Sequence, residues 1–459
     1  MARSILLPGV DDTIAAVSTP PGRSALAVVR VTGPRAHAVG QRALAPWRGT
    51  PRAAFLSTIR HPETGAIVDR PVVTVYAAPA SYTGEDMVEL SLHGGAAVPA
   101  LALGALLAAG AREALPGEFT RRAVANGKMD LLQAEAVGDL IDARSRAMHA
   151  MAFDQLDGGL SRRIAALRAA VLELEALIAY DIDFPEEDEG AVPPARVGQA
   201  AAGTIAALDT LLATADTGEM IRTGAAVVIA GLPNTGKSSL FNALVGHARA
   251  IVTDVPGTTR DALEALVDIG RWPVRLIDTA GIHETVEVVE RLGIEVSERW
   301  LARADIVLAC GDNDGSLADA LRRVRMLTPA PVIDVRTKSD LGDFPSSADE
   351  TVIVSAHTGA GLGALTSRIQ DILAFAHASP AAGEAAGAPL LTRERHRRGV
   401  ALARDEVTAF ARAWEQGELP ATVAAVHLRA ATGALETLIG VVDVEDVLDR
   451  VFANFCVGK

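Results

Sequence analysis

Residues Gly231 to Ser238 read Gly-Leu-Pro-Asn-Thr-Gly-Lys-Ser and so match the spacing Gly-x-x-x-x-Gly-Lys-Ser. In such a turn the backbone N–H groups converge on a β-phosphate, and the lysine neutralises charge on the β- and γ-phosphate oxygens. Lys237 would supply this charge, and the hydroxyl of Ser238 would hold a magnesium ion. The turn therefore predicts a nucleoside triphosphatase. The expected nucleotide contacts in it are Asn234, Thr235, Gly236, Lys237, Ser238 and Ser239.

Two later segments carry the groups that a nucleotide switch needs around the metal and the γ-phosphate. In the first, Gly257-Thr258-Thr259-Arg260-Asp261, a threonine hydroxyl can complete magnesium coordination. In the second, Asp278-Thr279-Ala280-Gly281, the aspartate would hold the metal through water, and the Gly281 N–H would contact the γ-phosphate. The predicted contacts here are Thr253, Asp254, Val255, Pro256, Gly257, Thr258, Thr259, Asp278, Thr279, Ala280 and Gly281.

Recognition of the base requires a carboxylate that accepts from the ring N–H and the exocyclic amine of guanine, which adenine does not offer together. Asp340, at the end of Thr337-Lys338-Ser339-Asp340, fits this role, and Ser355 with Ala356 would complete the base contacts. The motif usually begins with asparagine. Thr337 is a departure, because its shorter hydroxyl can tie the loop down but leaves its contact with the purine in question. The series of motifs favours guanine over adenine.

Strands alternating with helices must position these residues. Apolar runs precede the phosphate turn and the later motifs, and the turn leads into a helix whose N-terminus would face the phosphates. This alternation predicts a mostly parallel sheet that is covered on both faces. The expected strands are Ala225 to Ala230, Val274 to Ile277, Val332 to Val335 and Thr351 to Val354, and the expected helix is Ser238 to Val245.

The hydrolytic group is not the glutamine of small signalling GTPases, because Ile282 directly follows the Asp-x-x-Gly element. Another polar group must position the water, and no arginine finger is evident. A monovalent cation could compensate the phosphate charge if Asn234 offers its side-chain oxygen and the backbone before Gly257-Thr258 closes over it. The candidate carboxylates for water are Glu284, Glu287 and Glu290, although position alone favours a solvated helix carboxylate for each of them.

The chain has 459 residues, 49% of them hydrophobic, and a formal net charge of −14. This length predicts about three domains, and the charge argues against an autonomous RNA-binding protein. Two cysteines, Cys310 and Cys456, are too few for a disulfide framework. We expect a cytoplasmic protein without membrane integration, since no leader opens the chain and the alanine-rich run 96–109 is too short to span a bilayer.

Hydrophobic periodicity and turn-forming Gly and Pro residues divide the chain into four stretches. Residues 1–125 predict an α+β domain, and 221–377 form the nucleotide domain. The helical stretches 126–220 and 378–459 would together form one all-α domain into which the nucleotide domain is inserted. The apolar stripe of the first helical stretch consists of Leu160, Ile164, Leu167, Val171, Leu174 and Ile178. The acidic run 185–189 that follows is interpreted as a solvated loop.

Further motifs extend from Thr13 to the last residue, and with them the chain resembles the MnmE (TrmE) family of tRNA-modification GTPases. They are Ser18-Thr19-Pro20-Pro21-Gly22-Arg23, Ser81-Tyr82-Thr83-Gly84-Glu85-Asp86, His93-Gly94-Gly95, Pro116-Gly117-Glu118-Phe119-Thr120, Asn126-Gly127-Lys128-Met129-Asp130-Leu131 and Phe455-Cys456-Val457-Gly458-Lys459. The nucleotide motifs fit many GTPases, whereas these flanking motifs are specific to this family.

The resemblance implies an N-terminal domain that is similar to tetrahydrofolate-binding folds, forms a homodimer and binds a 5-formyl- or methylene-tetrahydrofolate. The implied contacts are Arg30, Glu89, Lys128 and Lys459. Cations suit the glutamate tail of a folate, and a carboxylate suits the N–H groups of its pterin. Without the family, Arg30 and Lys128 would be interpreted as ordinary surface charges.

The resemblance also implies a potassium-stimulated GTPase. Potassium would bind Asn234, Thr258 and the backbone carbonyls of Thr253 and Val255. Magnesium would bind Ser238 and Thr259, and Glu290 would position water, which selects one of the three glutamates by resemblance alone.

Members of the family act with the flavoprotein MnmG, as an expected heterotetramer, on the wobble uridine of certain tRNAs. Cys456 occupies the family's C-terminal cysteine position, where attack on the pyrimidine ring and simple burial of a small thiol both stay open.

Two other classes of function are compatible with parts of the sequence. A ribosome-assembly GTPase would use the switch to regulate RNA binding, but it predicts a basic RNA-binding module, which the acidic chain lacks. A folate-dependent one-carbon enzyme with a regulatory nucleotide domain would act independently of tRNA. The state of wobble uridines in cells separates all three.

Overall fold

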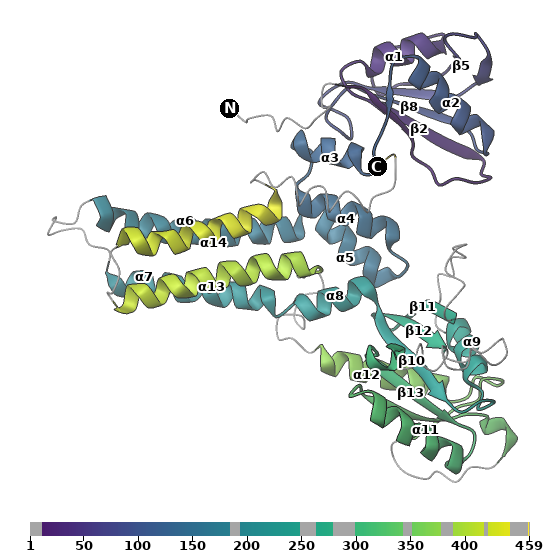
Figure 1. Ribbon diagram of the computed structural model, residues 1–459, viewed down its shortest axis with the longest axis vertical. Coiled ribbons are helices and arrows are strands. Elements are labelled where there is room, and N and C mark those ends of the chain that lie inside the picture. The colour runs from purple at the N-terminus through teal and green to yellow at the C-terminus, as the bar shows by residue number, and fades with distance from the viewer. Residues whose placement is uncertain are drawn as a thin grey trace. The chain divides into compact units, whose positions relative to one another are not determined.

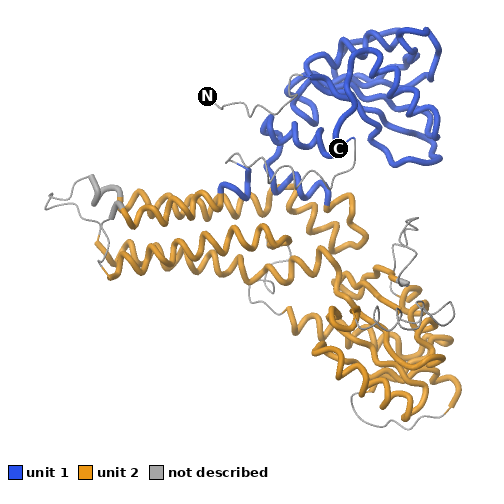
Figure 2. The backbone as a smooth tube through the Cα atoms, viewed as in Figure 1, with its two compact units in different colours: residues 1–138, 436–459 blue, residues 139–435 orange. Residues whose placement is uncertain are grey.

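The computed structural model describes residues 12–183, 193–247, 263–278, 299–342, 351–377, 389–416, 421–440 and 458. The chain divides into two compact units (Figure 2). One unit comprises residues 1–138 and 436–459, and the other comprises 139–435. Each is described on its own below.

The first unit is built on a six-stranded sheet with the order β4-β7-β8-β2-β1-β9. Neighbouring strands in this sheet are antiparallel, except that β1 and β9 are parallel. Alternate residues of the central strands are buried, as expected for a sheet with one face packed on a core. The strands are β1 (Ile14–Val17), β2 (Leu26–Thr32), β4 (Ala54–Leu56), β7 (Val72–Tyr76), β8 (Met87–His93) and β9 (Arg112–Glu113).

Helices α1 (Ala36–Ala43) and α2 (Ala97–Ala108) contribute to the core of this sheet. A small second sheet has the order β3-β5-β6, with β3 (Leu44–Ala45), β5 (Thr58–Arg60) and β6 (Ile67–Asp69). Helix α3 (Glu118–Ala125) follows β9, and α4 (Leu131–Asp142) leads toward the second unit. The mixture of strands and helices agrees with the α+β prediction for this stretch.

The second unit contains a set of long helices and a second sheet. The apolar stripe predicted from Leu160 to Ile178 lies on α6 (Gly159–Asp183), and all six of its residues are buried. Helix α7 (Pro194–Leu212) packs lengthwise against α13 (Glu394–Gln416), although the nucleotide domain separates them in sequence (Figure 1). The remaining helices are α5 (Arg146–Leu156), α8 (Ala215–Thr223) and α14 (Ala421–Ile439).

The sheet of the second unit has the strand order β11-β12-β10-β13-β14-β15. Strand β11 is antiparallel to β12, and the other neighbours are parallel. Strand β10 therefore lies between β12 and β13, where the chain reverses its direction of progress across the sheet. Ligands of open α/β sheets bind at the carboxyl ends of the strands at such a point. The strands are β10 (Ala225–Gly231), β11 (Leu263–Ile269), β12 (Trp272–Asp278), β13 (Ile306–Gly311), β14 (Val332–Arg336) and β15 (Val352–Ile353).

Helices cover both faces of this sheet, as predicted. Side chains of α9 (Lys237–His247) and α12 (Leu362–Ala376) belong to the core on one face, and α11 (Asp314–Leu327) packs in a separate core on the other. The central strand β10 has its first six residues buried because both faces are covered. Among the residues that the structure describes, no helix has the length and apolar character that crossing a bilayer requires.

Candidate nucleotide-binding site

The phosphate turn begins where β10 ends. Gly231 has φ 157°, and a Cβ added there would lie 2.4 Å from the carbonyl oxygen of Cys310 on the neighbouring strand β13. Asn234 and Gly236 have φ values of 63° and 87°, in the left-handed region. Glycine removes the steric cost at two of these positions, whereas Asn234 bears it. The backbone thus takes the path between strand and helix that the glycine spacing predicted.

Lys237 is the first residue of α9 and is buried. Its Nζ donates to the carbonyl oxygen of Leu232, 2.8 Å away. Burial lowers the pKa of Lys237, and the charge of Asp278 opposes part of this effect. Asp278 is fully buried at the carboxyl end of β12, in register with Ile229 of β10. The lysine is therefore directed into the turn, where a phosphate would give its ammonium group a stronger partner than a carbonyl.

The hydroxyl of Ser238 belongs to an exposed residue in the first turn of α9, and Ser239 beside it is also exposed. Hydroxyl and carboxylate oxygens are the ligands that magnesium prefers. Ser238 and Asp278 therefore have the chemistry that a magnesium ion on the phosphates needs.

Thr337 fastens the base-recognition loop to the phosphate turn. Its hydroxyl donates to the carbonyl oxygens of Thr235 at 2.5 Å and Gly311 at 3.2 Å, and the residue is buried. Its own N–H donates to the Gly311 carbonyl at 2.9 Å. The threonine that replaces the usual asparagine therefore still ties the two loops together.

Lys338 makes a second connection between the same loops. Its Nζ donates to the carbonyl oxygen of Asn234 at 2.7 Å and to the carboxylate of Asp312 at 3.0 Å. Lys338 has φ 58° and precedes a short 3-10 helix, η2 (Ser339–Leu341). Thr337 and Lys338 thus both join the phosphate turn to the base-recognition loop.

Asp340 lies in η2 and is exposed. The hydroxyl of the buried Ser355 donates to its Oδ1 at 2.6 Å, and this hydrogen bond lowers the pKa of Asp340. The carboxylate is ionised at neutral pH and oriented by Ser355, so it can accept from two N–H groups of a base.

A cavity of about 120 Å³ lies between the phosphate turn and these loops. Six of its lining residues were predicted as nucleotide contacts, and three were not. The predicted ones are Gly236, Ser239, Thr337, Lys338, Asp340 and Ala356. The others are Leu240, Val354 and His357, of which His357 directly follows the predicted Ser355-Ala356 pair and could have been found from that position.

Part of the predicted site lies outside the described residues. These positions are Thr253, Asp254, Val255, Pro256, Gly257, Thr258, Thr259, Thr279, Ala280, Gly281, Glu284, Glu287, Glu290, Cys456 and Lys459. The acidic run 185–189 also lies outside them.

Comparison with known proteins identifies the family. Residues 131–456 match the family model described as the MnmE helical domain, and residues 13–128 match that of the GTP-binding protein TrmE N-terminus. The chain belongs to the MnmE family. Proteins named tRNA modification GTPase MnmE are similar to it over their whole length. That of Methylorubrum populi is 44% identical over 459 residues, which cover 99% of each chain. That of Moorella thermoacetica is 40% identical over 468 residues, which cover 98% of this chain and all of the relative.

Membership of the MnmE family, together with the phosphate turn and the base loop, makes the chain a GTP hydrolase. A solved structure, the G domain of the FeoB iron transporter of T. maritima, has 26% sequence identity to it and covers 32% of this chain and 98% of its own. Its TM-score of 0.26 is too low to support a structural argument.

Arg30, Glu89 and Lys128, three of the residues that the family resemblance implied for folate, lie in the first unit. Arg30 and Glu89 are directly opposite each other on β2 and β8, and their side chains form an ion pair of 2.7 Å. The hydroxyl of Tyr76 donates to the other oxygen of Glu89 at 3.0 Å. The guanidinium carbon of Arg30 is 5.8 Å from the ring centroid of Tyr82. Arg30 and Glu89 thus form one cluster with two tyrosines.

Lys128 contacts the same loop that carries Tyr82. Its Nζ donates to the carbonyl oxygen of Pro79 at 3.0 Å, and a Cβ added at Gly84 would lie 3.2 Å from its Cγ. The structure gives no direct contact between Lys128 and Arg30. Lys459 cannot be placed, but Gly458 before it is described: its carbonyl oxygen accepts from the Ser18 hydroxyl at 3.0 Å.

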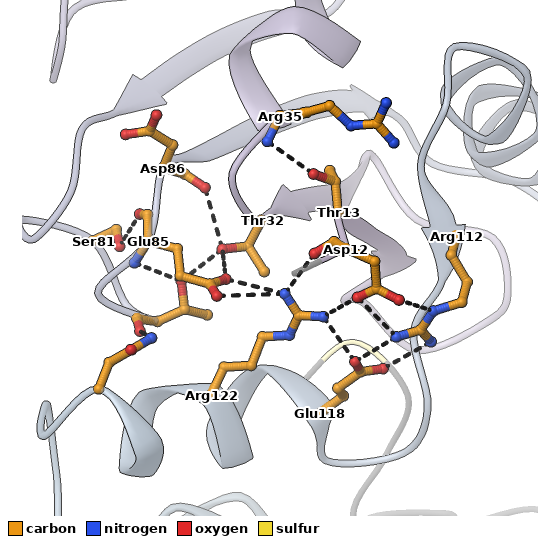
Figure 3. A network of polar contacts seen from close by, with 12 residues as sticks. Asp12, Thr13, Thr32, Arg35, Ser81, Glu85, Asp86, Arg112, Glu118 and Arg122 are labelled. Carbon is orange, nitrogen blue, oxygen red and sulfur yellow. Dashed lines mark hydrogen bonds and ion pairs between the residues drawn. The ribbon is translucent and has the colours of Figure 1, made fainter. Parts of the chain in front are cut away.

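A buried arginine holds the base of this loop (Figure 3). Arg122, with a side chain 2% exposed, donates to Asp12 at 2.6 Å and Glu118 at 3.0 Å and lies 3.3 Å from Glu85. Burial raises the pKa of Glu85, although the charge of Arg122 opposes this shift. Removing either partner of such a pair leaves the other charge buried and uncompensated. Sequence reasoning missed this network, because arginines are interpreted as surface residues unless a partner is known.

Proposed function

We propose that the chain is a potassium-stimulated GTPase that acts with a flavin-dependent partner, MnmG, on tRNA. Together they add a carboxymethylaminomethyl-type group to carbon 5 of the wobble uridine of certain tRNAs, with a tetrahydrofolate derivative as one-carbon donor. The observation that carries the proposal is the match to the MnmE family over nearly the whole chain, in the relatives as well as in both family models.

The proposed nucleotide chemistry combines residues of the described site with residues of the switch segments that the family resemblance implies. Asp340 selects guanine, while Lys237 neutralises the β- and γ-phosphate oxygens. Ser238 and Thr259 would hold magnesium, which would supply a Lewis acid on the phosphates. Asn234, Thr253, Val255 and Thr258 would hold potassium, which would supply the charge that an arginine finger provides in other GTPases. Glu290 positions the attacking water. Asn234 favours the potassium proposal, because its left-handed backbone and exposed position leave its side chain free to meet the nucleotide.

The folate proposal rests on the chemistry of the N-terminal cluster. Arg30 and Lys128 suit the carboxylates of a folate tail, and Glu89 suits the N–H groups of a pterin. Glu89 already accepts hydrogen bonds from Arg30 and Tyr76. A ligand would compete with these partners rather than meet a bare charge. Lys459 would be a further folate contact. Cys456 would either attack the pyrimidine ring or serve as a small buried thiol.

The proposed domain arrangement is an N-terminal domain (1–125), a helical domain (126–220 with 378–459) and an inserted G domain (221–377). It is supported by the packing of α7 on α13, since one helix precedes the G domain and the other follows it. A homodimer through the N-terminal domain, a heterotetramer with MnmG and a cytoplasmic location belong to the same proposal.

Analysis of wobble nucleosides tests this function. Total tRNA from cells that lack the gene would be digested and its nucleosides analysed by mass spectrometry, with a strain carrying the gene on a plasmid as control. The proposal predicts loss of the modified uridine and its return in the complemented strain. Normal modification in the deletion strain would leave a ribosome-assembly GTPase or a tRNA-independent folate enzyme as the remaining functions.

A further inference from the structure

Asp312 directly follows strand β13, and its carboxylate is held by three donors. The Ser316 hydroxyl and the Asn313 side-chain amide both donate to Oδ1 at 3.0 Å, and Lys338 Nζ donates to Oδ2 at 3.0 Å. Asn313 and Ser316 also form the capping box that starts α11. The start of this helix therefore fixes the carboxylate before it meets the lysine.

The same contacts favour the ionised form of the Asp312 carboxylate. The hydrogen bond from Lys338 lowers the pKa of Asp312, and the Ser316 hydroxyl contributes. Both side chains of the ion pair are partly exposed, 36% for Lys338 and 29% for Asp312. A pair with this exposure is screened by solvent, so its contribution is modest and depends on salt.

The ammonium group of Lys338 is the point at which three segments meet. The ammonium group contacts Asp312 after β13 and the carbonyl oxygen of Asn234 in the phosphate turn. The backbone of Lys338 itself belongs to the base loop. Asn234 and Lys338 both have left-handed φ values, 63° and 58°, which cost free energy for residues other than glycine. Such conformations persist only where the surroundings enforce them.

We propose that Asp312 is a positioning residue of the guanine-nucleotide site. It holds Lys338 against the carbonyl of Asn234, and so keeps the phosphate turn and the base loop at the spacing that the nucleotide spans. Thr337 makes the other connection, through its hydroxyl, so the ion pair acts by orienting the second link, the hydrogen bond from Lys338 to the Asn234 carbonyl. This inference rests on nucleotide binding at the site under the proposed function.

Release of fluorescently labelled GDP from the full-length protein tests the inference. Asp312→Asn keeps the shape but removes the charge, and we expect release to accelerate about twofold to fivefold at low salt, as for a half-exposed ion pair. Asp312→Glu keeps the negative charge, so its GDP release should be slower than that of Asp312→Asn and closer to the wild-type rate. The matched control is Asp314→Asn, at the first residue of α11. Its side chain is 94% exposed and pairs with Arg336, and neither residue lines the cavity.

A double-mutant cycle separates positioning from a general structural role. In a Lys338→Met background, Asp312→Asn should no longer change GDP release, because the partner of the carboxylate is gone. An equal acceleration in both backgrounds would overturn the inference, as would release from Asp312→Asn that matches the wild type at low salt. If the wild type itself retains no GDP, the proposed function fails instead, so the two failures are distinguishable.

Discussion

At the scale of single residues, the nucleotide site depends on Thr337. Its buried hydroxyl contacts the carbonyl oxygens of Thr235 and Gly311, which belong to the phosphate turn and to β13. A side-chain amide would reach farther, but the hydroxyl lies 2.5 Å from the Thr235 carbonyl, whereas the Gly311 carbonyl also accepts from the Thr337 N–H. The substitution of a short residue in the base motif therefore preserves the connection between the loops.

Thr337→Val keeps the volume of the side chain and removes this donor. We expect the free energy of unfolding to fall by about 1–3 kcal/mol, because a buried carbonyl loses its partner, and the affinity for GDP to fall with it. Chemical denaturation and nucleotide titration would measure both. Thr210→Val is the control, since its hydroxyl donates to Ala206 on an exposed helix surface; an equal loss there would contradict the assignment.

Burial of Lys237 makes a prediction about pH. Its pKa is lowered in the free protein and should rise when phosphate favours the charged form. Affinity for GDP is therefore complete below the free-protein pKa and declines as the pH rises through it, and binding above that pH takes up protons. Calorimetry at about pH 9.5 in buffers of different ionisation enthalpy would detect this uptake. Guanine itself loses its ring proton near this pH and must regain it to donate to Asp340, so both proteins take up that proton. Lys237→Arg, which stays charged, should show less uptake than the wild type; equal uptake in both proteins would mean that Lys237 contributes none.

At the scale of elements, the site requires β10 and β13 to lie close together. Gly231 closes this approach, with the carbonyl of Cys310 where its side chain would be. Cys310 itself is fully buried, and burial raises the pKa of its thiol to about 12, so it is an unreactive packing residue.

Gly231→Ala should therefore disturb the turn. We expect a loss of about 1–3 kcal/mol in the free energy of unfolding from the forced contact and weaker GDP binding. Gly246→Ala, in the last turn of α9 where an added Cβ meets open space, should instead stabilise the protein, by at most about 0.5–1 kcal/mol. Thermal and chemical unfolding would compare the two; unchanged stability in Gly231→Ala would mean that the strands separate easily.

The switch segments give a prediction on hydrolysis. Replacing sodium by potassium should accelerate GTP hydrolysis, because the cation compensates charge on the phosphates. Glu290→Ala should slow hydrolysis in potassium by about 100-fold or more, as for a group that positions water, and spare GTP affinity. Single-turnover assays would measure the rates and titrations the affinity. Equal rates in both salts would remove the cation from the mechanism, and weakened binding would make Glu290 structural.

The sequence predicts the elements better than the contacts between them. The predicted strand Ala225 to Ala230 corresponds to β10 and Val274 to Ile277 to β12, because apolar runs mark buried strands. Asp312 could not be found in this way, because a carboxylate after a strand gains meaning only once that strand lies beside the phosphate turn. Arg122 was missed for the same reason, since its partners come from residues 12, 85 and 118.

At the scale of the whole molecule, residues far apart in the sequence meet in the first unit, where Gly458 contacts Val17 and Ser18. A Cβ at Gly458 would lie 2.4 Å from the Val17 carbonyl, and Gly458 has φ 93°. Gly458→Ala should therefore displace the C-terminus and weaken binding of 5-formyl-tetrahydrofolate by on the order of tenfold, equivalent to about 1.4 kcal/mol. Affinity for GDP should not change.

Calorimetric titration with each ligand would measure these effects. The control is Gly363→Ala, on α12, where an added Cβ meets open space. Folate affinity equal to that of the wild type would show that the C-terminal contact plays no part in that site.

The contact between Ser18 and Gly458 joins residues 440 positions apart. A ribosome adding about 5–20 residues per second needs roughly 20–90 seconds to make the intervening chain. Throughout that interval the nascent protein can complete its GTPase core but cannot form this contact beside β1. The hydrogen bond between Ser18 and Gly458 therefore belongs to the last steps of folding during synthesis.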